Sequence, residues 1–202
     1  MNEKVKIGAV ILAAGLSQRM GRQKLVLPWG KRTVIEQVIE SLYNGGAEAI
    51  TVVSGKSHDL LTGRLSGSGV QLVFNPDYAN GSMLTSLKVG LNALEQTSAE
   101  AALLALGDQP QIQAQTVQAV ISAYRVQPAK IIVPSWQMRR GHPWAIPAVF
   151  WEEILSSGAE YTMRDFLKSH EMDIEYVLVD TPTIIADLDT PEDYEREKPR
   201  WL

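Results

Sequence analysis

A loop of small and cationic residues follows the first apolar run of the chain. Residues 12–24 read LAAGLSQRMGRQK, in which Gly15 and Gly21 lie six positions apart and Arg19 and Lys24 supply positive charge. Small residues let a ligand approach the backbone, whose N–H groups can hold phosphate oxygens while the cations neutralise their charge. The spacing is neither that of a P-loop nor that of a dinucleotide-binding loop. The segment predicts a phosphate-binding loop of another kind, with a solvated basic turn as the alternative.

Acidic residues occur at two further places where carboxylates could hold a metal ion. Asp108 directly follows the apolar run AALLALG, and Asp187 and Asp189 alternate around Leu188. A carboxylate at the carboxyl end of a strand can share Mg²⁺ with phosphate groups, although Asp before a proline is also common in turns. On an extended segment Asp187 and Asp189 would face the same side. The sequence predicts a magnesium site at Asp108, with the choice between Asp187 and Asp189 open.

Two other loops carry polar or basic side chains that could contact a second substrate. The stretch FNPDYANGSMLTSL contains Gly81 and Ser82 at the start of a helical pattern, where unpaired N–H groups could meet an anion or a base edge. The stretch WQMRRGHPWAIP contains Arg140 and His142 before an apolar run. The ordinary alternatives are an Asn-Gly turn with Ser82 as a helix N-cap, and a solvated basic turn with a packing histidine.

The segments that must position these residues alternate between two kinds of hydrophobic pattern. Short runs rich in β-branched residues predict strands at 5–12, 49–54, 70–74, 101–107 and 130–134. Their near-continuous apolarity indicates that both faces of the sheet are covered, as in a parallel sheet. Ligands of such sheets bind at the carboxyl ends of the strands, and the candidate loops all follow predicted strands. The less regular region 134–190 is expected to add a strand or two.

Apolar residues spaced three and four apart predict the intervening helices. One begins at the N-cap Thr33 and ends at Gly45, and others lie within 82–96 and 115–126. Near the C-terminus, Thr190 as N-cap followed by Pro191 predicts a further helix. Alternating strands and helices imply right-handed crossovers and a three-layer α/β/α sandwich with a mostly parallel sheet.

Composition restricts the class of protein further. The chain has 202 residues, of which 45% are hydrophobic and 21% charged, so we expect one globular domain spanning 1–202. A net charge of −4 argues against nucleic acid or a membrane as a partner. The absence of cysteine excludes disulfides and Cys-based zinc sites. The apolar stretch at the start is too short to cross a bilayer, and a cytoplasmic location is expected.

The first loop resembles the signature L-A-A-G-x-S-x-R-M-G-x-x-K of the nucleotidyltransferases that form molybdenum cofactor dinucleotides. In that family the loop wraps the nucleoside triphosphate. The resemblance implies a Rossmann-like nucleotidyltransferase fold, nucleotide binding by the loop, and catalytic roles for Arg19 and Lys24 on the phosphates. The matching residues are Leu12, Ala13, Ala14, Gly15, Ser17, Arg19, Met20, Gly21 and Lys24.

Both acidic segments also resemble motifs of this family. The stretch GDQP resembles the Gly-Asp-x-Pro element, which implies that Asp108 is catalytic and binds the metal. Gln109 is frequent in the cytidylyl-transferring branch, whereas the guanylyl branch usually has Met. The stretch DLDTPED resembles the C-terminal motif, and it implies that Asp187 or Asp189 approaches the metal or the acceptor. The related guanylyl enzymes tend to have Asn there.

The remaining two loops resemble the family elements near the nucleotide and the acceptor. The element Asn-Pro…Gly-Met…Ser-Leu implies nucleotide binding by Asn75, Pro76 and Gly81 and acceptor binding by Ser86. Here Ser82 stands between Gly81 and Met83, which departs from the family pattern. The stretch RGHP resembles the cytidylyl branch and implies that its arginine and histidine, Arg140 and His142, bind the acceptor.

The resemblance implies a Mg²⁺-dependent enzyme that transfers CMP from CTP to the phosphate of molybdopterin and releases pyrophosphate. Its partners would include a molybdoenzyme or its chaperone. A phosphate acceptor is already anionic, which explains why no Ser-His-Asp or Cys-His pattern is visible. The alternatives are a guanylyltransferase on the same acceptor, a transferase for a sugar or alcohol phosphate, and a delivery module without catalysis. A dinucleotide-dependent oxidoreductase is disfavoured because the first loop lacks G-x-G-x-x-G.

Overall fold

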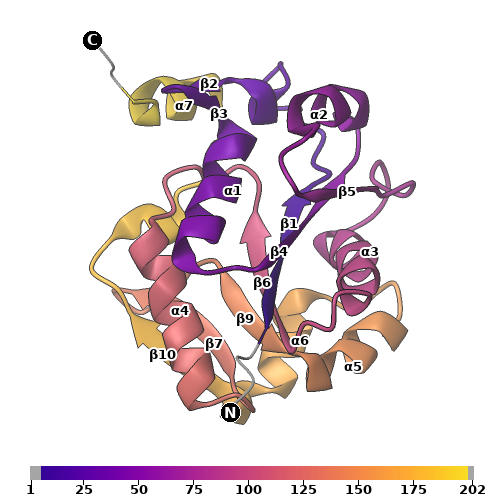
Figure 1. Cartoon of the computed structure of the whole chain (residues 1–202), viewed down its shortest axis with the longest axis vertical. Coiled ribbons are helices and arrows are strands. Elements are labelled where there is room, and N and C mark those ends of the chain that lie inside the picture. The colour runs from indigo at the N-terminus through magenta and orange to yellow at the C-terminus, as the bar shows by residue number, and fades with distance from the viewer. Residues whose placement is uncertain (1–5, 200–202) are drawn as a thin grey trace.

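A computed structural model describes residues 6–199 of the protein (Figure 1). Most strands belong to one sheet, and a short hairpin of β2 (Pro28–Trp29) and β3 (Arg32–Thr33) lies apart from it. The strands of the main sheet are β1 (Ile7–Ala13), β4 (Ala49–Ser54), β5 (Gln71–Phe74), β6 (Ala101–Leu106), β7 (Ile131–Trp136), β8 (Arg139–Arg140), β9 (Trp144–Pro147) and β10 (Ile174–Leu178).

The strand order is β10-β7-β9-β6-β1-β4-β5, with β8 paired to β7. β1 is parallel to both β4 and β6, β4 to β5, and β7 to β10. β9 is antiparallel to both β6 and β7, so those two strands run in the same direction. The carboxyl ends of all the long strands except β9 therefore lie at one edge, which we call the carboxyl edge. The predicted mostly parallel sheet is confirmed, and the less regular region adds three strands, β8, β9 and β10, where one or two were expected.

Helices cover both faces of the sheet and give the predicted three layers (Figure 1). One apolar core joins the sheet to α1 (Val34–Gly45), α2 (His58–Leu65) and α4 (Ala114–Val126). A second core joins the opposite face to α3 (Met83–Glu95), α5 (Trp151–Ser156) and α6 (Met163–Ser169). Gly90 allows α3 to approach the sheet closely, because a Cβ there would lie 2.2 Å from Cγ1 of Val10.

The helix boundaries follow local chemistry that the sequence predicted. Thr33 forms a capping box with Glu36 at the start of α1, and Gly46 ends that helix in a left-handed conformation. Thr190 likewise caps α7 (Pro191–Glu197), with the proline in its first turn. These caps fix where each helix begins, and thereby where the preceding loop must end.

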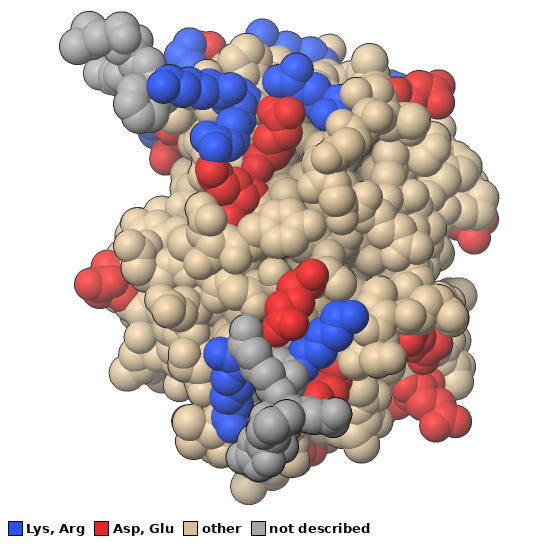
Figure 2. Space-filling model, in the orientation of Figure 1, with Lys and Arg blue, Asp and Glu red and all other residues tan. Residues whose placement is uncertain are grey.

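Charged groups on the face seen in Figure 2 are mixed in sign. Basic and acidic side chains lie next to one another around the upper part of this view, where β2, β3 and α2 lie in Figure 1. Arg32 on β3 pairs with Glu40 on α1, and Arg64 on α2 pairs with Glu36 on α1. Within residues 6–199, no helix combines the length and the apolar character needed to cross a membrane.

Candidate active site

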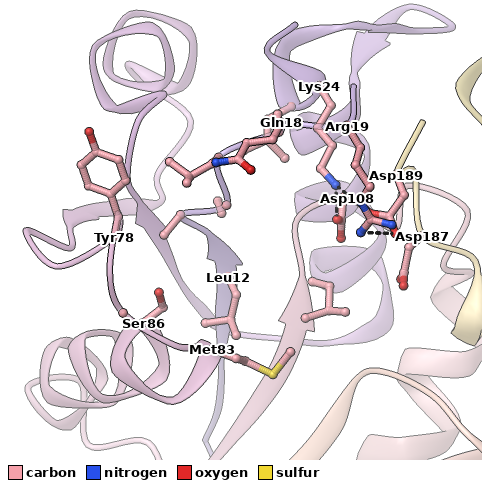
Figure 3. Close-up of a pocket in the computed structure, with 18 of the residues that line it drawn as sticks. Leu12, Gln18, Arg19, Lys24, Tyr78, Met83, Ser86, Asp108, Asp187 and Asp189 are labelled. Carbon is pink, nitrogen blue, oxygen red and sulfur yellow. Dashed lines mark hydrogen bonds and ion pairs between the residues drawn. The ribbon is translucent and has the colours of Figure 1, made fainter. Parts of the chain in front are cut away.

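A pocket of about 580 Å³ lies at the carboxyl edge of the sheet, between the first loop, the start of α3 and the C-terminal segment (Figure 3). It has a charged side, formed by cations and carboxylates, and a side lined by α3 and the loop before it. The sequence-predicted residues that line it are Leu12, Ala13, Ala14, Gly15, Ser17, Arg19, Lys24, Gly81, Ser86, Asp108, Asp187 and Asp189. Segments distant in the sequence thus meet in one cavity.

Lys24 joins the three charged segments. Its side chain is 11% exposed, and Nζ lies 2.5 Å from Oδ2 of Asp108 and 3.5 Å from Oδ1 of Asp189. Nζ also donates to the backbone carbonyl of Leu188 at 2.9 Å. Ion pairs that are shielded from water interact more strongly than exposed ones. Lys24 is therefore held in place by its partners and faces the cavity as a fixed positive charge.

Arg19 approaches the same acidic segment from the outer part of the loop. Its guanidinium lies 2.8 Å from Oδ2 of Asp189, although its side chain is 72% exposed. Ser17, two residues earlier, and Gly21, two residues later, both have positive φ, at 52° and 68°. These two left-handed residues turn the loop sharply on each side of Arg19. The Arg19 side chain is thus much less enclosed by protein than that of Lys24.

Asp187 has a neutral partner rather than a cation. Nε2 of Gln109 donates to Oδ1 of Asp187 at 2.6 Å. Desolvation raises the pKa of Asp187, and the negative charges of Asp108 and Asp189 raise it further, whereas the Gln109 hydrogen bond and Lys24 act in the opposite direction. Burial is therefore the main reason that the charged form of Asp187 is disfavoured, and a cation bound beside this carboxylate would stabilise that form.

Besides the ion pairs of Asp189, the C-terminal segment is held against the pocket by contacts that carry no charge. The backbone N–H of Leu188 donates to the carbonyl of Asp108 at 3.0 Å. A third apolar cluster packs Leu188 and Tyr194 with Met20, Trp29 and Val34. These contacts place Asp187 and Asp189 beside β6, although about 80 residues separate them from Asp108 in the chain.

On the α3 side, the predicted nucleotide-binding residues and Ser86, which was predicted to bind the acceptor, occupy different positions. Gly81 and Ser86 line the pocket, but Asn75 and Pro76 are not among its lining residues. Asn75 is buried, where its Nδ2 donates to Oγ of Ser86 at 3.0 Å and its Oδ1 accepts from the backbone N–H of Asp77 at 3.0 Å. Pro76 is exposed. Asn75 therefore stabilises the loop and holds the Ser86 hydroxyl in position from outside the pocket.

Ser82, the residue that departs from the family pattern, caps α3. Its side chain accepts from the N–H of Thr85, and the Thr85 side chain accepts from the Ser82 N–H at 3.1 Å. A Cβ on Gly81 would lie 2.7 Å from the carbonyl oxygen of Asp77, so this position requires glycine or a shift of the loop. The extra residue is accommodated as an N-cap, and both Gly81 and Ser82 still line the pocket.

Arg140 and His142 do not line the pocket. The Arg140 guanidinium is exposed and lies 5.4 Å from the centroid of the Tyr176 ring. His142 stacks on Trp144 with ring centroids 4.7 Å apart, and burial lowers its pKa to about 4. Its Nε2 is buried without a hydrogen-bond partner among the described residues. Their acceptor-binding role stays a prediction that this arrangement does not favour.

Sequence reasoning missed several residues on the side of the pocket that has no charged groups, which we call the neutral side. Tyr78 and Met83 flank the predicted Gly81-Ser82 turn, and Leu106 precedes Asp108. Met83 is 44% exposed although it begins an amphipathic helix. A methionine next to the Gly-Ser turn was the signal available in the sequence. Together with Leu12, these side chains give the neutral side an apolar surface.

A metal ion here would need further oxygen ligands besides the carboxylates of the pocket. Within residues 6–199 there is no group of three His, Cys, Asp or Glu side chains arranged to hold a metal. Asp108 and Asp187 nevertheless line the same pocket and influence each other electrostatically. Mg²⁺ is typically bound by one or two carboxylates together with substrate phosphates. The carboxylates therefore fit a metal that is completed by the phosphates of a nucleotide.

Known proteins share this sequence pattern and this fold. The molybdenum cofactor cytidylyltransferase of Escherichia coli (strain K12) is 29% identical over 195 residues, which cover 96% of this chain and 97% of that protein. The nicotine blue oxidoreductase of Paenarthrobacter nicotinovorans is 28% identical over 195 residues, which cover 92% and 93%. The crystal structure of Rv0371c from Mycobacterium tuberculosis H37Rv superposes with a TM-score of 0.82 at 24% identity, over 96% and 97% of the two chains.

A family model assigns the chain more directly. The model described as a MobA-like NTP transferase domain matches residues 9–174, which is most of the chain and includes the first loop and Asp108. The Rossmann-like architecture, the cation-rich loop and the carboxylates at the carboxyl edge all agree with this match. The chain therefore belongs to the MobA-like NTP transferase family and is a nucleotidyltransferase.

Proposed function

We propose that this nucleotidyltransferase transfers CMP from CTP to the phosphate of a molybdopterin-type acceptor, in a reaction that depends on Mg²⁺. The main support is the cluster in which Lys24 meets Asp108 and Asp189 beside Arg19, since it combines phosphate-binding cations with metal-binding carboxylates. The choice of substrates is supported by the E. coli cytidylyltransferase, which aligns with almost the whole chain. A cytoplasmic location belongs to this proposal.

The proposed reaction is an in-line displacement. A terminal phosphate oxygen of the acceptor attacks the α-phosphorus of CTP, the bond from the α-phosphorus to the bridging oxygen breaks, and pyrophosphate leaves. The acceptor oxygen is already negatively charged near neutral pH, so no general base is required. Catalysis then depends on positioning and on electrostatic stabilisation.

The charged side of the pocket would perform both tasks. Asp108 would hold Mg²⁺, which, when bound, would neutralise charge on the phosphates. Arg19 and Lys24 would leave their carboxylate partners in part and stabilise the charge that develops on pyrophosphate. Because Lys24 is fixed by its contacts, little reorganisation would be needed when the leaving group becomes negative.

The neutral side of the pocket suits a planar ring. Tyr78, Met83, Leu12 and Leu106 offer apolar surface, and the hydroxyl of Ser86 offers a hydrogen-bonding group. Pockets for nucleotides combine such surfaces with a few placed polar groups. We propose that a ring of one of the two substrates lies here, with its phosphates directed toward Lys24.

Calorimetric titration with CTP, GTP, ATP and UTP, with and without Mg²⁺, tests the proposal. We expect Mg²⁺-dependent binding with CTP preferred, followed by CTP-dependent pyrophosphate release when molybdopterin is added. Preference for GTP would replace cytidylyl with guanylyl transfer on the same acceptor. Release of pyrophosphate only with a sugar or alcohol phosphate would exclude molybdopterin as the acceptor, and binding without any turnover would indicate a delivery module.

The oxidoreductase among the relatives defines a different alternative. An enzyme of that class would transfer electrons and would have no use for a triphosphate-binding cluster. Oxidation of NADH or NADPH by the purified chain, without any CTP-dependent pyrophosphate release, would favour that class over nucleotidyl transfer to molybdopterin.

A further inference from the structure

A turn outside the pocket contacts both of its sides. Residues 55–57, which we call turn 55–57, join β4 to α2, and none of the three lines the pocket. The N–H of His58 donates to the carbonyl of Gly55 at 2.9 Å, and that of Leu61 donates to the carbonyl of Ser57 at 3.0 Å. These hydrogen bonds join the turn to the first residues of α2.

Ser57 connects the turn to the first loop. It is 1% exposed, and its hydroxyl makes no capping hydrogen bond with α2 but donates to Oε1 of Gln23. Gln23 directly precedes Lys24, the cation that lies between Asp108 and Asp189. Hydrogen bonds are stronger where water is partly excluded. The turn therefore restrains the end of the first loop from outside the pocket.

Gly55 lies between the first loop and the loop before α3. A Cβ at this position would be 2.6 Å from the carbonyl oxygen of Ala14 and 2.6 Å from Cβ of Tyr78. Ala14 and Tyr78 both line the pocket, and Figure 3 shows Tyr78 across it from Lys24. The two segments can approach the turn this closely only because position 55 has no side chain.

A row of rings connects the start of α2 to the same tyrosine. The ring centroids of His58 and Phe74 are 5.1 Å apart, and those of Phe74 and Tyr78 are 6.0 Å apart. The hydroxyl of Ser54 donates to the carbonyl of Val73 at 3.0 Å, so it accepts from Nδ1 of His58 at 2.7 Å. Aromatic pairs at such distances stabilise each other beyond their contact area. The row therefore supports the Tyr78 ring from outside the pocket.

We propose that turn 55–57 is a positioning element that fixes the spacing between the first loop and Tyr78. This role rests on the proposed function, in which a nucleoside triphosphate binds with its phosphates at the first loop and its ring beside Tyr78. Because both segments are already restrained, ordering them costs little free energy when the nucleotide binds. Ser57 acts through Gln23 on the phosphates, and Phe74 acts through Tyr78 on the ring.

Calorimetric titration with two probes, inorganic tripolyphosphate and CTP, each with Mg²⁺, tests the two connections. Ser57→Ala removes the hydrogen bond to Gln23 and should weaken the binding of both probes by about fivefold. Phe74→Ala should weaken the binding of CTP by about threefold and leave that of tripolyphosphate unchanged, because only CTP has a ring. Ser68→Ala is the matched control, since Ser68 donates to the carbonyl of Leu65 at the opposite end of α2, at 2.6 Å. It should change neither affinity.

A double-mutant cycle tests whether Ser57 acts through Gln23. Gln23→Met should weaken tripolyphosphate binding by about fivefold, and the two changes together should weaken it no further. Losses that multiply would show that the two residues act separately. In Ser57→Ala the KM for CTP should rise by about fivefold, whereas kcat should change by less than about twofold, because the contacts of Lys24 do not depend on Ser57. A lower kcat with an unchanged KM would contradict the positioning role.

Gly55→Ala changes the spacing itself. The added Cβ forces Ala14 or Tyr78 to move, so the binding of CTP should weaken by about tenfold or more. Thermal unfolding shows whether this variant folds, and where it does not, the Ser57 and Phe74 variants decide.

Unchanged tripolyphosphate binding in Ser57→Ala, unchanged CTP binding in Phe74→Ala, or no tripolyphosphate binding by the unaltered chain would overturn the proposal. If the unaltered chain bound tripolyphosphate but no nucleoside triphosphate, the proposed function would fail. The comparison of Ser57→Ala with Ser68→Ala would then still test the connection between the turn and the first loop.

Discussion

Two neighbouring segments of the carboxyl edge carry predicted acceptor residues, and only one of them reaches the pocket. The C-terminal segment 186–190 places Asp187 and Asp189 in the cavity. The basic segment 139–142 is adjacent, since the N–H of His142 donates to the carbonyl of Ile184 at 3.0 Å. Its side chains nevertheless contact Tyr176 and Trp144 instead of the pocket.

The direction of backbone pairing explains this difference. Arg140 pairs with Ser135 on β7, and its guanidinium lies over the ring of Tyr176 on β10, the strand next to β7. Gly141 lies so close to the next segment that a Cβ would be 2.3 Å from the carbonyl oxygen of Ile184. Segment 186–190, in contrast, pairs with the end of β6 through Leu188. For these two motifs, the neighbour to which the backbone bonds therefore decides which one reaches the pocket.

The largest expected effect comes from removing the carboxylate at the end of β6. Asp108→Ala should lower kcat by about 10³-fold, or about 4 kcal/mol, because a central electrostatic group of the transition state is lost. Steady-state measurement of pyrophosphate release gives the value. A variant within tenfold of the unaltered enzyme would remove Asp108 from catalysis and leave the pocket without its main catalytic carboxylate.

Residues of the basic segment 139–142 should affect the stability of the fold and not the turnover of the enzyme. Burial lowers the pKa of His142 to about 4, below its ordinary value of 6.5, so the unfolded chain binds more protons than the folded one between these values. The free energy of unfolding should therefore fall as the pH falls through this window, by at most about 3 kcal/mol.

Denaturant unfolding near pH 7 and near pH 5 measures this effect. His142→Gln should make the stability less dependent on pH. His170 is a matched control of opposite sign: burial lowers its pKa, but Glu153 and Asp173 raise it more, and the net shift is upward. His170 therefore stabilises the fold at low pH and loses this contribution as the pH rises. An unchanged pH dependence in His142→Gln would contradict the burial of that ring.

Lys24 tests the connection between the first loop and segment 186–190. Lys24→Met should lower kcat/KM by about 10²-fold, about 2.7 kcal/mol, because the fixed cation disappears and Asp108 and Asp189 then repel each other. Kinetics with CTP as the varied substrate provide the measurement. A loss of less than tenfold would show that the cation only ties the segments together.

The smallest effect compares two exposed arginines of the same edge. Arg19→Ala should lower kcat/KM by about tenfold, or about 1.4 kcal/mol, whereas Arg140→Ala should remain within about threefold. Parallel measurements of kcat/KM for the two variants, with both substrates present, test this difference. Equal losses would mean that the basic segment moves to the pocket when the acceptor binds, and the division between the two segments would no longer hold.

Sequence patterns predicted the scaffold well because the relevant signals are local. Apolar patterns gave β1, β4, β5, β6 and β7 together with α1, α3 and α4, and Thr33 and Thr190 gave two helix starts. The small residues of the first loop were recognised because they lie within one short stretch of the chain. Asp108 was recognised for the same reason, within the stretch GDQP. Asn75 illustrates the limit, since its motif suggested contact with the nucleotide, whereas its side chain orients Ser86 from behind the pocket.

The sequence by itself determined the order of the main strands and helices, the caps at Thr33 and Thr190 and the chemical type of the charged groups, since each depends on residues within a few positions of one another. Only the tertiary structure decided that Lys24 lies between Asp108 and Asp189, that Gln109 holds Asp187, and that Arg140 faces Tyr176. These contacts join segments separated by tens of residues. Their geometry depends on strand register and on the packing of Leu188 and Tyr194, which no local pattern encodes.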